Sequence, residues 1–222
     1  MTDLAQRKET TAPGWGQEAV KRALDIALAS VLMVIAAPLM LLLWCLVPWT
    51  SAGPALFRQE RLGCDMRPFT MLKLRSMYVG NDDRVHRAYV TGMLSAEQEA
   101  PARNGALYKL VDDPRVTPLG AWLRRTSLDE LPQLINVLRG DMSFVGPRPM
   151  LPWEAQLLAE PYRPRFTVKP GITGLWQVSG RSRLSMRTAL ELDVEYARRR
   201  SMLLDLTILA RTVPALFRGG AN

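Results

Sequence analysis

The stretch from Ile26 to Trp49 reads IALASVLMVIAAPLMLLLWCLVPW and contains no charged residue. A straight helix of about 24 residues is roughly 36 Å long, enough to cross the apolar core of a bilayer. The run starts too late and is too long for a secretory signal peptide, and no small-residue cleavage site follows it. We therefore expect a membrane-embedded segment rather than the buried core helix of a soluble protein.

Pro38 lies near the middle of this segment. Proline removes a backbone donor and bends a helix, which would leave two arms of roughly 18 Å, each long enough for about one leaflet. Basic residues flank both ends, with Lys21-Arg22 before the segment and three arginines between positions 58 and 67 after it. Since positive residues favour the cytoplasmic side, we favour a re-entrant helix-break-helix over a straight span.

The composition limits the chemistry. Apolar residues make up 48% of the chain and the net charge is +8, which favours an anionic partner such as nucleic acid, an acidic lipid surface or a phosphate-bearing substrate. The single histidine, His86, excludes histidine-based triads and His-rich zinc sites. Cys45 and Cys64 do not form a disulfide framework. Acid–base or nucleophilic chemistry must therefore use carboxylates.

The chain divides into a polar tail over residues 1–20, a membrane segment over 21–50 and a cytoplasmic-face catalytic domain over 51–222. We expect an α+β fold that is mostly helical, with one short β-hairpin region and amphipathic helices that lie on the membrane surface. Composition and periodicity predict strands at 56–58 and 69–74, and helices at 84–100, 119–125, 128–139 and 185–217, the last broken near Pro214.

Two adjacent acids, Asp129 and Glu130, lie in the sequence TSLDELPQ over residues 126–133. We place them in the first turn of the 128–139 helix, with Thr126 or Ser127 as N-cap and Gly140 as its stop. Arg124 and the helix N-terminus favour ionised acids, and an ionised Asp can act as nucleophile or metal ligand. The plainer alternative is a capping box between Ser127 and Glu130.

Several basic residues could hold phosphate. The Gly-Pro-Arg-Pro sequence at 146–149 presents Arg148 on a stiff loop, and arginine can bind phosphate oxygens with two hydrogen bonds. Lys73 and Arg75 lie on the predicted hairpin, and Arg115 follows an Asp-Asp-Pro turn. These side chains could converge on a diphosphate or form a solvated basic face.

The segment from Lys169 to Arg181 reads KPGITGLWQVSGR and contains three glycines, an aromatic residue and the polar side chains of Gln177 and Arg181. Such a composition can hold a nucleotide base or its phosphates against backbone donors. A turn followed by a short strand would explain the same residues.

Taken in order, these motifs resemble the monotopic phosphoglycosyl transferases, bacterial sugar transferases that join a sugar phosphate to undecaprenyl phosphate. The resemblance runs from about Lys21 to the C-terminus. It rests on Lys-Arg-x-x-Asp at 21–25, KLRSM at 73–77, DPRVT at 113–117, TSLDELPQ at 126–133, GPRP at 146–149 and the 169–181 segment.

The resemblance implies a re-entrant membrane helix and an aspartate nucleophile at Asp129. It implies that Glu130, with Asp129, engages Mg²⁺, with Mn²⁺ as a possible substitute, and that Arg124 and Arg148 bind phosphate. The implied substrates are a UDP-sugar and undecaprenyl phosphate, at the cytoplasmic face of the bacterial inner membrane, and a homodimer stays open.

Two rival classes are less well supported. A basic nucleic-acid-binding protein would explain the net charge and the arginines at 198–200, but it should stay soluble without detergent, whereas the 26–49 run predicts membrane association. A non-catalytic membrane scaffold with the same fold would not need Asp129, Glu130 and Arg148 together.

Overall fold

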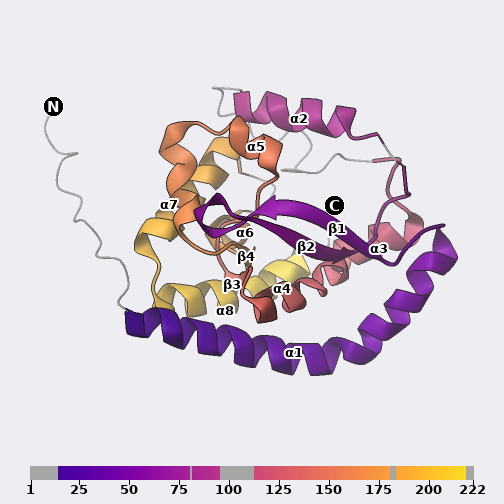
Figure 1. Cartoon of the computed structure of the whole chain (residues 1–222), viewed down its shortest axis with the longest axis horizontal. Helices are drawn as coiled ribbons and strands as arrows, with labels where there is room; N and C mark the ends of the chain where they lie inside the picture. The colour runs from indigo at the N-terminus through magenta and orange to yellow at the C-terminus, as the bar shows by residue number, and fades with distance from the viewer. Residues whose placement is uncertain (1–14, 81, 96–112, 181–183, 219–222) are drawn as a thin grey trace, which may run out of the picture.

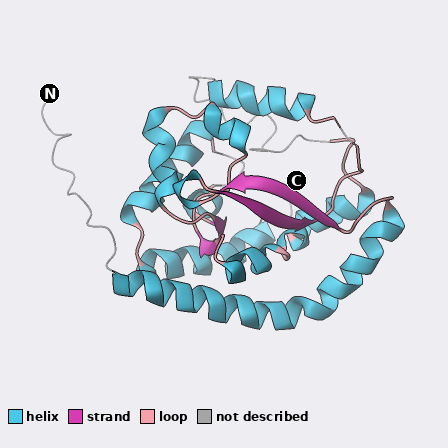
Figure 2. Ribbon diagram, in the orientation of Figure 1, coloured by secondary structure: helices cyan, strands magenta, loops and turns pink. Residues whose placement is uncertain are grey.

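The computed structural model describes residues 15–80, 82–95, 113–180 and 184–218. Figure 2 shows that helices dominate and that strands form one long hairpin and one small pair. The predicted α+β, mostly helical class is therefore confirmed. The 1–20 tail falls largely outside the described residues, as do Arg181 and the part of the 81–106 segment beyond Ser95.

The apolar segment forms one continuous helix, α1 (Trp15–Thr50), which contains Pro38 and Pro48. We expected a break into two helices at Pro38, and the helix instead continues through it. Figure 1 shows that α1 bends around the remainder of the molecule. A proline inside a helix costs one hydrogen bond and displaces the preceding turn, so it can bend a helix without ending it. The re-entrant topology stays a prediction.

One face of α1 packs on the domain. Ala29, Leu43 and Val47 are 0%, 2% and 1% exposed and belong to two of the buried apolar clusters. The other face is apolar but open, with Val34 at 75% and Leu41 at 70% exposure. Within the described residues, α1 is the one helix long and apolar enough to cross a membrane. Only 11% of the most apolar 18-residue stretch of α1 is buried, whereas the core helix of a soluble protein is mostly buried.

The predicted hairpin is present. Strand β1 (Leu56–Leu62) pairs antiparallel with β2 (Pro68–Leu74) in a register that places Phe57 opposite Lys73 and Arg61 opposite Phe69. A short 3₁₀ turn, η1 (Cys64–Met66), joins the strands. The second sheet is parallel and pairs β3 (Ser143–Val145) with β4 (Gly171–Thr173).

The remaining helices surround these sheets (Figure 1). They are α2 (Arg84–Ser95), α3 (Pro118–Thr126), η3 (Leu128–Glu130), α4 (Gln133–Arg139), α5 (Pro152–Gln156), η4 (Glu160–Thr167), α6 (Leu175–Ser179), α7 (Met186–Arg199) and α8 (Met202–Arg218). The C-terminal helix predicted for 185–217 is in fact two helices, and its break falls at Arg200 and Ser201. Pro214 lies inside α8, so the expected break there is wrong.

Helix α8 presents apolar residues both to the core and to the exterior; the expected position of amphipathic helices on a membrane surface stays a prediction. Ile208 is 1% exposed and packs in the main core with Tyr196, whereas Leu203 and Leu206 are 77% and 56% exposed. Figure 1 shows α8 beside the N-terminal half of α1. Two helices with exposed apolar faces thus lie at the same side of the domain.

Candidate active site

The adjacent acids lie in η3, immediately after α3 ends. Ser127 ends α3 in the left-handed conformation (φ 59°, ψ 17°) and makes no side-chain hydrogen bond to the following turn. Our expectation of an N-cap at Thr126 or Ser127 is therefore wrong, because an N-cap needs extended backbone angles. A 3₁₀ turn comes first and α4 starts only at Gln133, while Gly140 (φ 91°) ends α4 as predicted.

Glu130 does not form the capping box that we considered as an alternative. Its Oε1 lies 3.1 Å from Nζ of Lys73, and the two side chains are 28% and 16% exposed. Lys73 lies in strand β2, 57 positions before Glu130 in the sequence, so the fold brings its positive charge to the acid pair. The Lys73–Glu130 ion pair is partly buried, which restricts both side chains, and it is exposed enough for a ligand to reach it.

Asp129 is buried, with 8% exposure, and it lies within the electrostatic influence of Arg124. Burial lowers the pKa of the Arg124 guanidinium, and the negative charges of Asp129 and Asp113 raise it. Nη1 of Arg124 is buried without a hydrogen-bond partner among the described residues. A buried donor of this kind is costly, so the site gains stability when an anion accepts from it.

A solvent-open pocket with about 260 Å³ of empty space, part of it bulk solvent, is lined by Glu130, whereas Asp129 is not among its lining residues. It brings together four predicted residues from four separate motifs: Lys73, Glu130, Arg148 and Gln177. Oε1 of Gln177 is buried and has no hydrogen-bond partner within the described parts of the chain. The other lining residues are Arg61, Met71, Gln133, Pro149, Gly171 and Ile172.

Arg61 was not among our predicted site residues. The hairpin register pairs Gln59 with Met71 and Arg61 with Phe69, so alternate residues 61, 71 and 73 share one face of the ribbon. Arg61 is held there by Gln59 and by the carbonyl of Pro149 at 3.1 Å. Strand alternation, applied outward from Lys73, could have identified it.

Two predicted phosphate ligands are not brought to the cavity. The guanidinium of Arg75 donates five hydrogen bonds to residues 51–54, which tie the end of α1 to β2. Arg115 binds both carboxylate oxygens of Asp113, at 2.8 and 2.7 Å, and the carbonyl of Asp82. These bonds occupy all five guanidinium donors of Arg75 and three of those of Arg115, and neither residue lines the cavity. Their phosphate-binding roles stay predictions. Arg181 lies outside the described residues.

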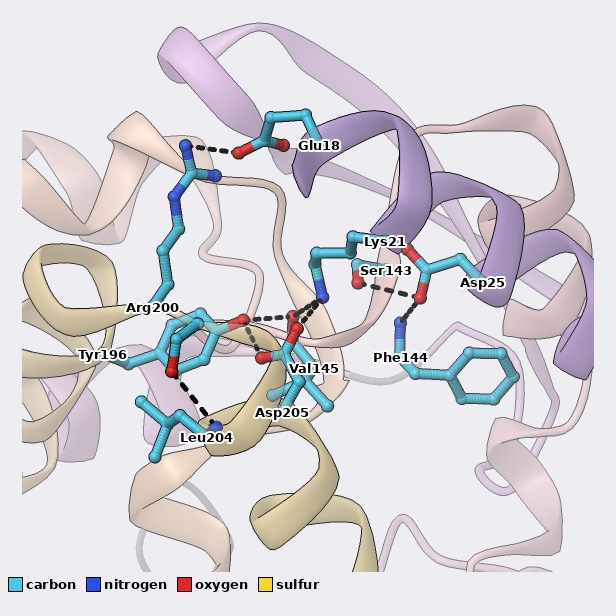
Figure 3. A network of polar contacts seen from close by, with 11 residues as sticks. Glu18, Lys21, Asp25, Ser143, Phe144, Val145, Tyr196, Arg200, Leu204 and Asp205 are labelled. Atoms are coloured by element: carbon cyan, nitrogen blue, oxygen red, sulfur yellow. Dashed lines mark hydrogen bonds and ion pairs between the residues drawn. The ribbon is translucent and has the colours of Figure 1, made fainter. Parts of the chain in front are cut away.

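A polar network connects α1 to β3, α7 and α8 (Figure 3). Nζ of Lys21 lies 2.6 Å from Oδ2 of Asp205, and the Tyr196 hydroxyl donates to Oδ1 of Asp205 at 2.7 Å. The same hydroxyl contacts the carbonyl of Val145 at 3.0 Å. Burial raises the pKa of the Tyr196 hydroxyl, so it stays a donor. Val145 ends β3 and leads into the loop that carries Arg148.

Asp25 completes this attachment. Its Oδ1 accepts hydrogen bonds from Ser143 Oγ and from the Phe144 backbone N–H, both at 3.1 Å (Figure 3). Arg22 donates to the carbonyls of Val137 and Leu138 at the end of α4. The Lys-Arg-x-x-Asp motif therefore docks α1 onto the two elements that flank the acid pair and Arg148.

The residues present fit a magnesium ion of the kind that takes most of its ligands from substrate and water. Among the described residues, no group of three or more His, Cys, Asp or Glu side chains is arranged to hold a metal by itself. Mg²⁺ is commonly bound by one or two carboxylates together with substrate phosphates. Asp129 and Glu130 match that donor set, with Glu130 shared with Lys73.

The fold and the site together define an enzyme with a basic, carboxylate-containing cavity, docked on a long helix with an open apolar face. The sequence model of the family described as "Bacterial sugar transferase" matches residues 16–219, and the chain belongs to this family.

Relatives agree with this assignment. The chain is 39% identical over 196 residues to an exopolysaccharide production protein ExoY of Sinorhizobium fredii, covering 88% of the chain and 84% of the relative. It is 40% identical over 211 residues to the UDP-glucose:undecaprenyl-phosphate glucose-1-phosphate transferase of Escherichia coli, covering 91% of the chain and 40% of that protein. It is also 38% identical over 199 residues to the undecaprenyl-phosphate galactose phosphotransferase of Salmonella typhimurium, covering 90% of the chain and 40% of that protein.

Proposed function

We propose that the chain is a phosphoglycosyl transferase that moves a sugar 1-phosphate from a UDP-sugar to undecaprenyl phosphate and releases UMP. The names of the relatives from Escherichia coli and Salmonella typhimurium support the carrier lipid and the class of reaction. The observation that carries the proposal is the meeting of Glu130, Lys73 and Arg148 around one cavity, with buried Asp129 directly before Glu130 in η3.

The proposed reaction has two steps at one phosphorus atom. An oxygen of ionised Asp129 attacks the phosphorus that bears the sugar, the bond from that phosphorus to the UMP oxygen breaks, and a sugar-phosphoryl aspartate forms. An oxygen of the polyprenol phosphate then attacks the same phosphorus, and the bond to Asp129 breaks. The product is polyprenyl-diphosphate-sugar, and Asp129 is regenerated.

The side chains of the cavity have distinct parts in this scheme. Arg148 and Lys73 offset the charge of the diphosphate, and Arg124 supplies a further buried cation near Asp129. A bound Mg²⁺, held by Glu130 and Asp129, would withdraw charge from the phosphate oxygens. Lys73 also holds Glu130 in place through the 3.1 Å contact.

The open apolar faces of α1 and α8 support a location at a membrane. We assign the domain to the cytoplasmic face of the bacterial inner membrane, because the nucleotide sugar is soluble and the carrier phosphate lies at the interface. The re-entrant form of α1 would let both of its docked ends stay on that face.

The proposal is tested by measuring UMP release from a panel of UDP-hexoses and UDP-N-acetylhexosamines in the presence of undecaprenyl phosphate and Mg²⁺. We expect release with at least one donor and transfer of radiolabelled sugar phosphate to the lipid. No release from any donor by folded protein would overturn the proposed function.

A further inference from the structure

A buried ion pair lies next to the cavity but takes no part in the scheme above. Arg165 in η4 and Asp193 in α7 are joined by a nitrogen–oxygen distance of 2.6 Å, and their side chains are 2% and 3% exposed. A buried ion pair rarely stabilises a fold more than apolar residues of similar volume would. A role other than stabilising the fold would explain why Arg165 and Asp193 are buried together.

The Arg165 guanidinium reaches beyond Asp193 to the backbone that carries Arg148. Its Nη2 donates to the carbonyl oxygen of Arg148 at 2.7 Å, as well as to Asp193 Oδ2. Its Nη1 contacts the sulfur of Met150 at 2.9 Å. One planar group therefore contacts the chain on both sides of Pro149.

The other half of this loop is held by the small parallel sheet. The backbone N–H of Gly146 donates to the carbonyl of Thr173, and the carbonyl of Pro147 accepts from Gly171, both at 2.9 Å. A Cβ atom at Gly146 would lie 2.3 Å from the carbonyl oxygen of Lys169, so this contact admits only glycine. The sheet thus fixes residues 146 and 147, and Arg165 fixes the segment from Arg148 onward.

Arg148 itself lies between two cavities. Arg148 lines the cavity that contains Glu130 and Lys73, and it also lines a second, solvent-open pocket whose walls include Arg165 and Phe166. Burial raises the pKa of the Asp193 carboxyl to about 6, against the lowering effects of Arg165 and Arg148. Asp193 therefore interacts with both arginines.

We propose that Asp193 and Arg165 are positioning residues: Asp193 orients the Arg165 guanidinium, which holds the backbone of Arg148 so that its side chain faces the donor diphosphate. The inference rests on the proposed function, in which Arg148 binds phosphate. The contacts run from Asp193 in α7 through Arg165 to the backbone of Arg148, and the sequence of the 146–149 loop gives no sign of them.

A double-mutant cycle separates positioning from plain stabilisation. Asp193→Asn should lower kcat/KM for the UDP-sugar by at least about tenfold in an otherwise unchanged chain. In an Arg148→Ala background the same substitution should lower it by less than about twofold, because Asp193 acts on the reaction only by positioning the Arg148 side chain. Equal losses in both backgrounds would overturn the inference. Arg165→Lys retains the charge but replaces the planar guanidinium, whose two terminal nitrogens contact Met150, the Arg148 carbonyl and Asp193, by a single ammonium group, so it should show the same pattern.

Matched controls come from the same two elements. Glu191→Gln in α7 and Arg163→Lys in η4 change exposed ion pairs, with Arg187 and with Glu160. Both controls should retain kcat/KM within about twofold, since exposed pairs contribute little. Thermal unfolding in detergent reports how much of each variant is folded. If Asp193→Asn and Arg165→Lys both fail to fold, the pair is a stability element and the inference is wrong.

Calorimetric titration with UDP gives a readout that does not require turnover. We expect Asp193→Asn and Arg148→Ala to weaken UDP binding by similar factors, and the double variant to bind no more weakly than Arg148→Ala alone. If the wild-type chain binds UDP but releases no UMP from any UDP-sugar, the proposed function fails while the titrations still decide the positioning role. Wild-type chain that does not bind UDP would overturn the positioning role as well.

Discussion

Nζ of Lys73 lies 3.1 Å from Oε1 of Glu130, so a residue of the β-hairpin and one of the two adjacent acids form an ion pair. The contact gives Glu130 a partner other than its own backbone. Burial lowers the pKa of the Arg124 guanidinium, and Asp129, the buried neighbour of Glu130, is close enough to Arg124 for its negative charge to raise that pKa. The two acids therefore have different surroundings, and different roles can be tested.

Asp129→Asn keeps the shape of the side chain and removes the anionic oxygen. With UDP-sugar alone, we expect the wild-type chain to release up to about one equivalent of UMP and to gain the mass of one sugar phosphate, and the variant to do neither. Mass spectrometry of the intact chain and of its peptides measures both. Retention of UMP release within about tenfold of wild type, a barrier difference of roughly 1.4 kcal/mol, would exclude a covalent role for Asp129.

Glu130→Gln should slow the reaction and weaken its dependence on Mg²⁺, because the amide is a poor ligand and no longer pairs with the Lys73 charge. Initial rates over a Mg²⁺ titration, with a chelator as the zero point, measure this. Any adduct that forms should still map to the peptide containing Asp129. An unchanged Mg²⁺ titration curve would remove Glu130 from the proposed metal site.

The topology of α1 is tested by single cysteines at Gly16 and Ala52, both exposed, in a chain whose Cys45 and Cys64 have been replaced. We expect equal labelling from the cytoplasmic side at the two positions, because a bent helix can return to the face from which it entered. Labelling from opposite sides would establish a spanning helix. Pro38→Ala should shift the pattern toward crossing, and an unchanged pattern would mean that Pro38 does not set the turn.

The docking of α1 depends on Asp205, whose side chain pairs with Lys21 and accepts from Tyr196. Asp205→Asn removes the charge that offsets Lys21, and we expect a loss of roughly 2–3 kcal/mol in the free energy of unfolding. Denaturant unfolding in detergent measures it. Glu195→Gln, which changes the exposed pair with Arg199, should cost less than about 0.5 kcal/mol. Equal losses of unfolding free energy in the two variants would show that the Asp205 contacts stabilise the fold no more than an exposed ion pair does.

Two glycines in helices should respond oppositely to alanine. A Cβ atom at Gly120 in α3 would lie 2.0 Å from the Ser76 carbonyl oxygen, so Gly120→Ala should destabilise the chain by at least about 2 kcal/mol. Nothing lies within 4 Å of a Cβ at Gly92 in α2, where alanine should stabilise by about 0.5–1 kcal/mol. Thermal unfolding of both variants tests the packing of α3 on the 73–77 segment. A stable Gly120→Ala variant would contradict it.

Local patterns predicted the features that depend on neighbours in sequence. The apolar run at 26–49 predicted a long membrane-type helix, strand propensity predicted the 69–74 strand, and Gly140 marked the end of α4. The acid pair, Lys73, Arg148 and Gln177 were recognised from their motifs, and four of these five line one cavity. These features are readable because hydrophobic period, turn chemistry and charge act over a few residues.

Other features were misread for the same reason. Pro214 has the local character of a helix break, yet α8 continues through it, and the chain turns instead at Arg200 and Ser201. Ser127 has the character of an N-cap, but tertiary packing uses it as the left-handed end of α3. A local preference of about 1 kcal/mol is readily overridden by the burial of an apolar face.

Residue order was enough to predict an apolar helix, a hairpin and a carboxylate pair suited to phosphate chemistry, because each depends on residues that are close in the chain. Only the folded chain shows which basic residues lie close to the acids and which are bound elsewhere. In the folded chain Lys73 pairs with Glu130, whereas Arg75 and Arg115 bind groups in nearby loops. Arg61 contacts the Pro149 carbonyl beside the cavity, and Arg165, paired with Asp193, donates to the Arg148 carbonyl. An arginine's motif specifies its charge, but its role depends on which acceptors lie within about 3 Å once the chain has folded.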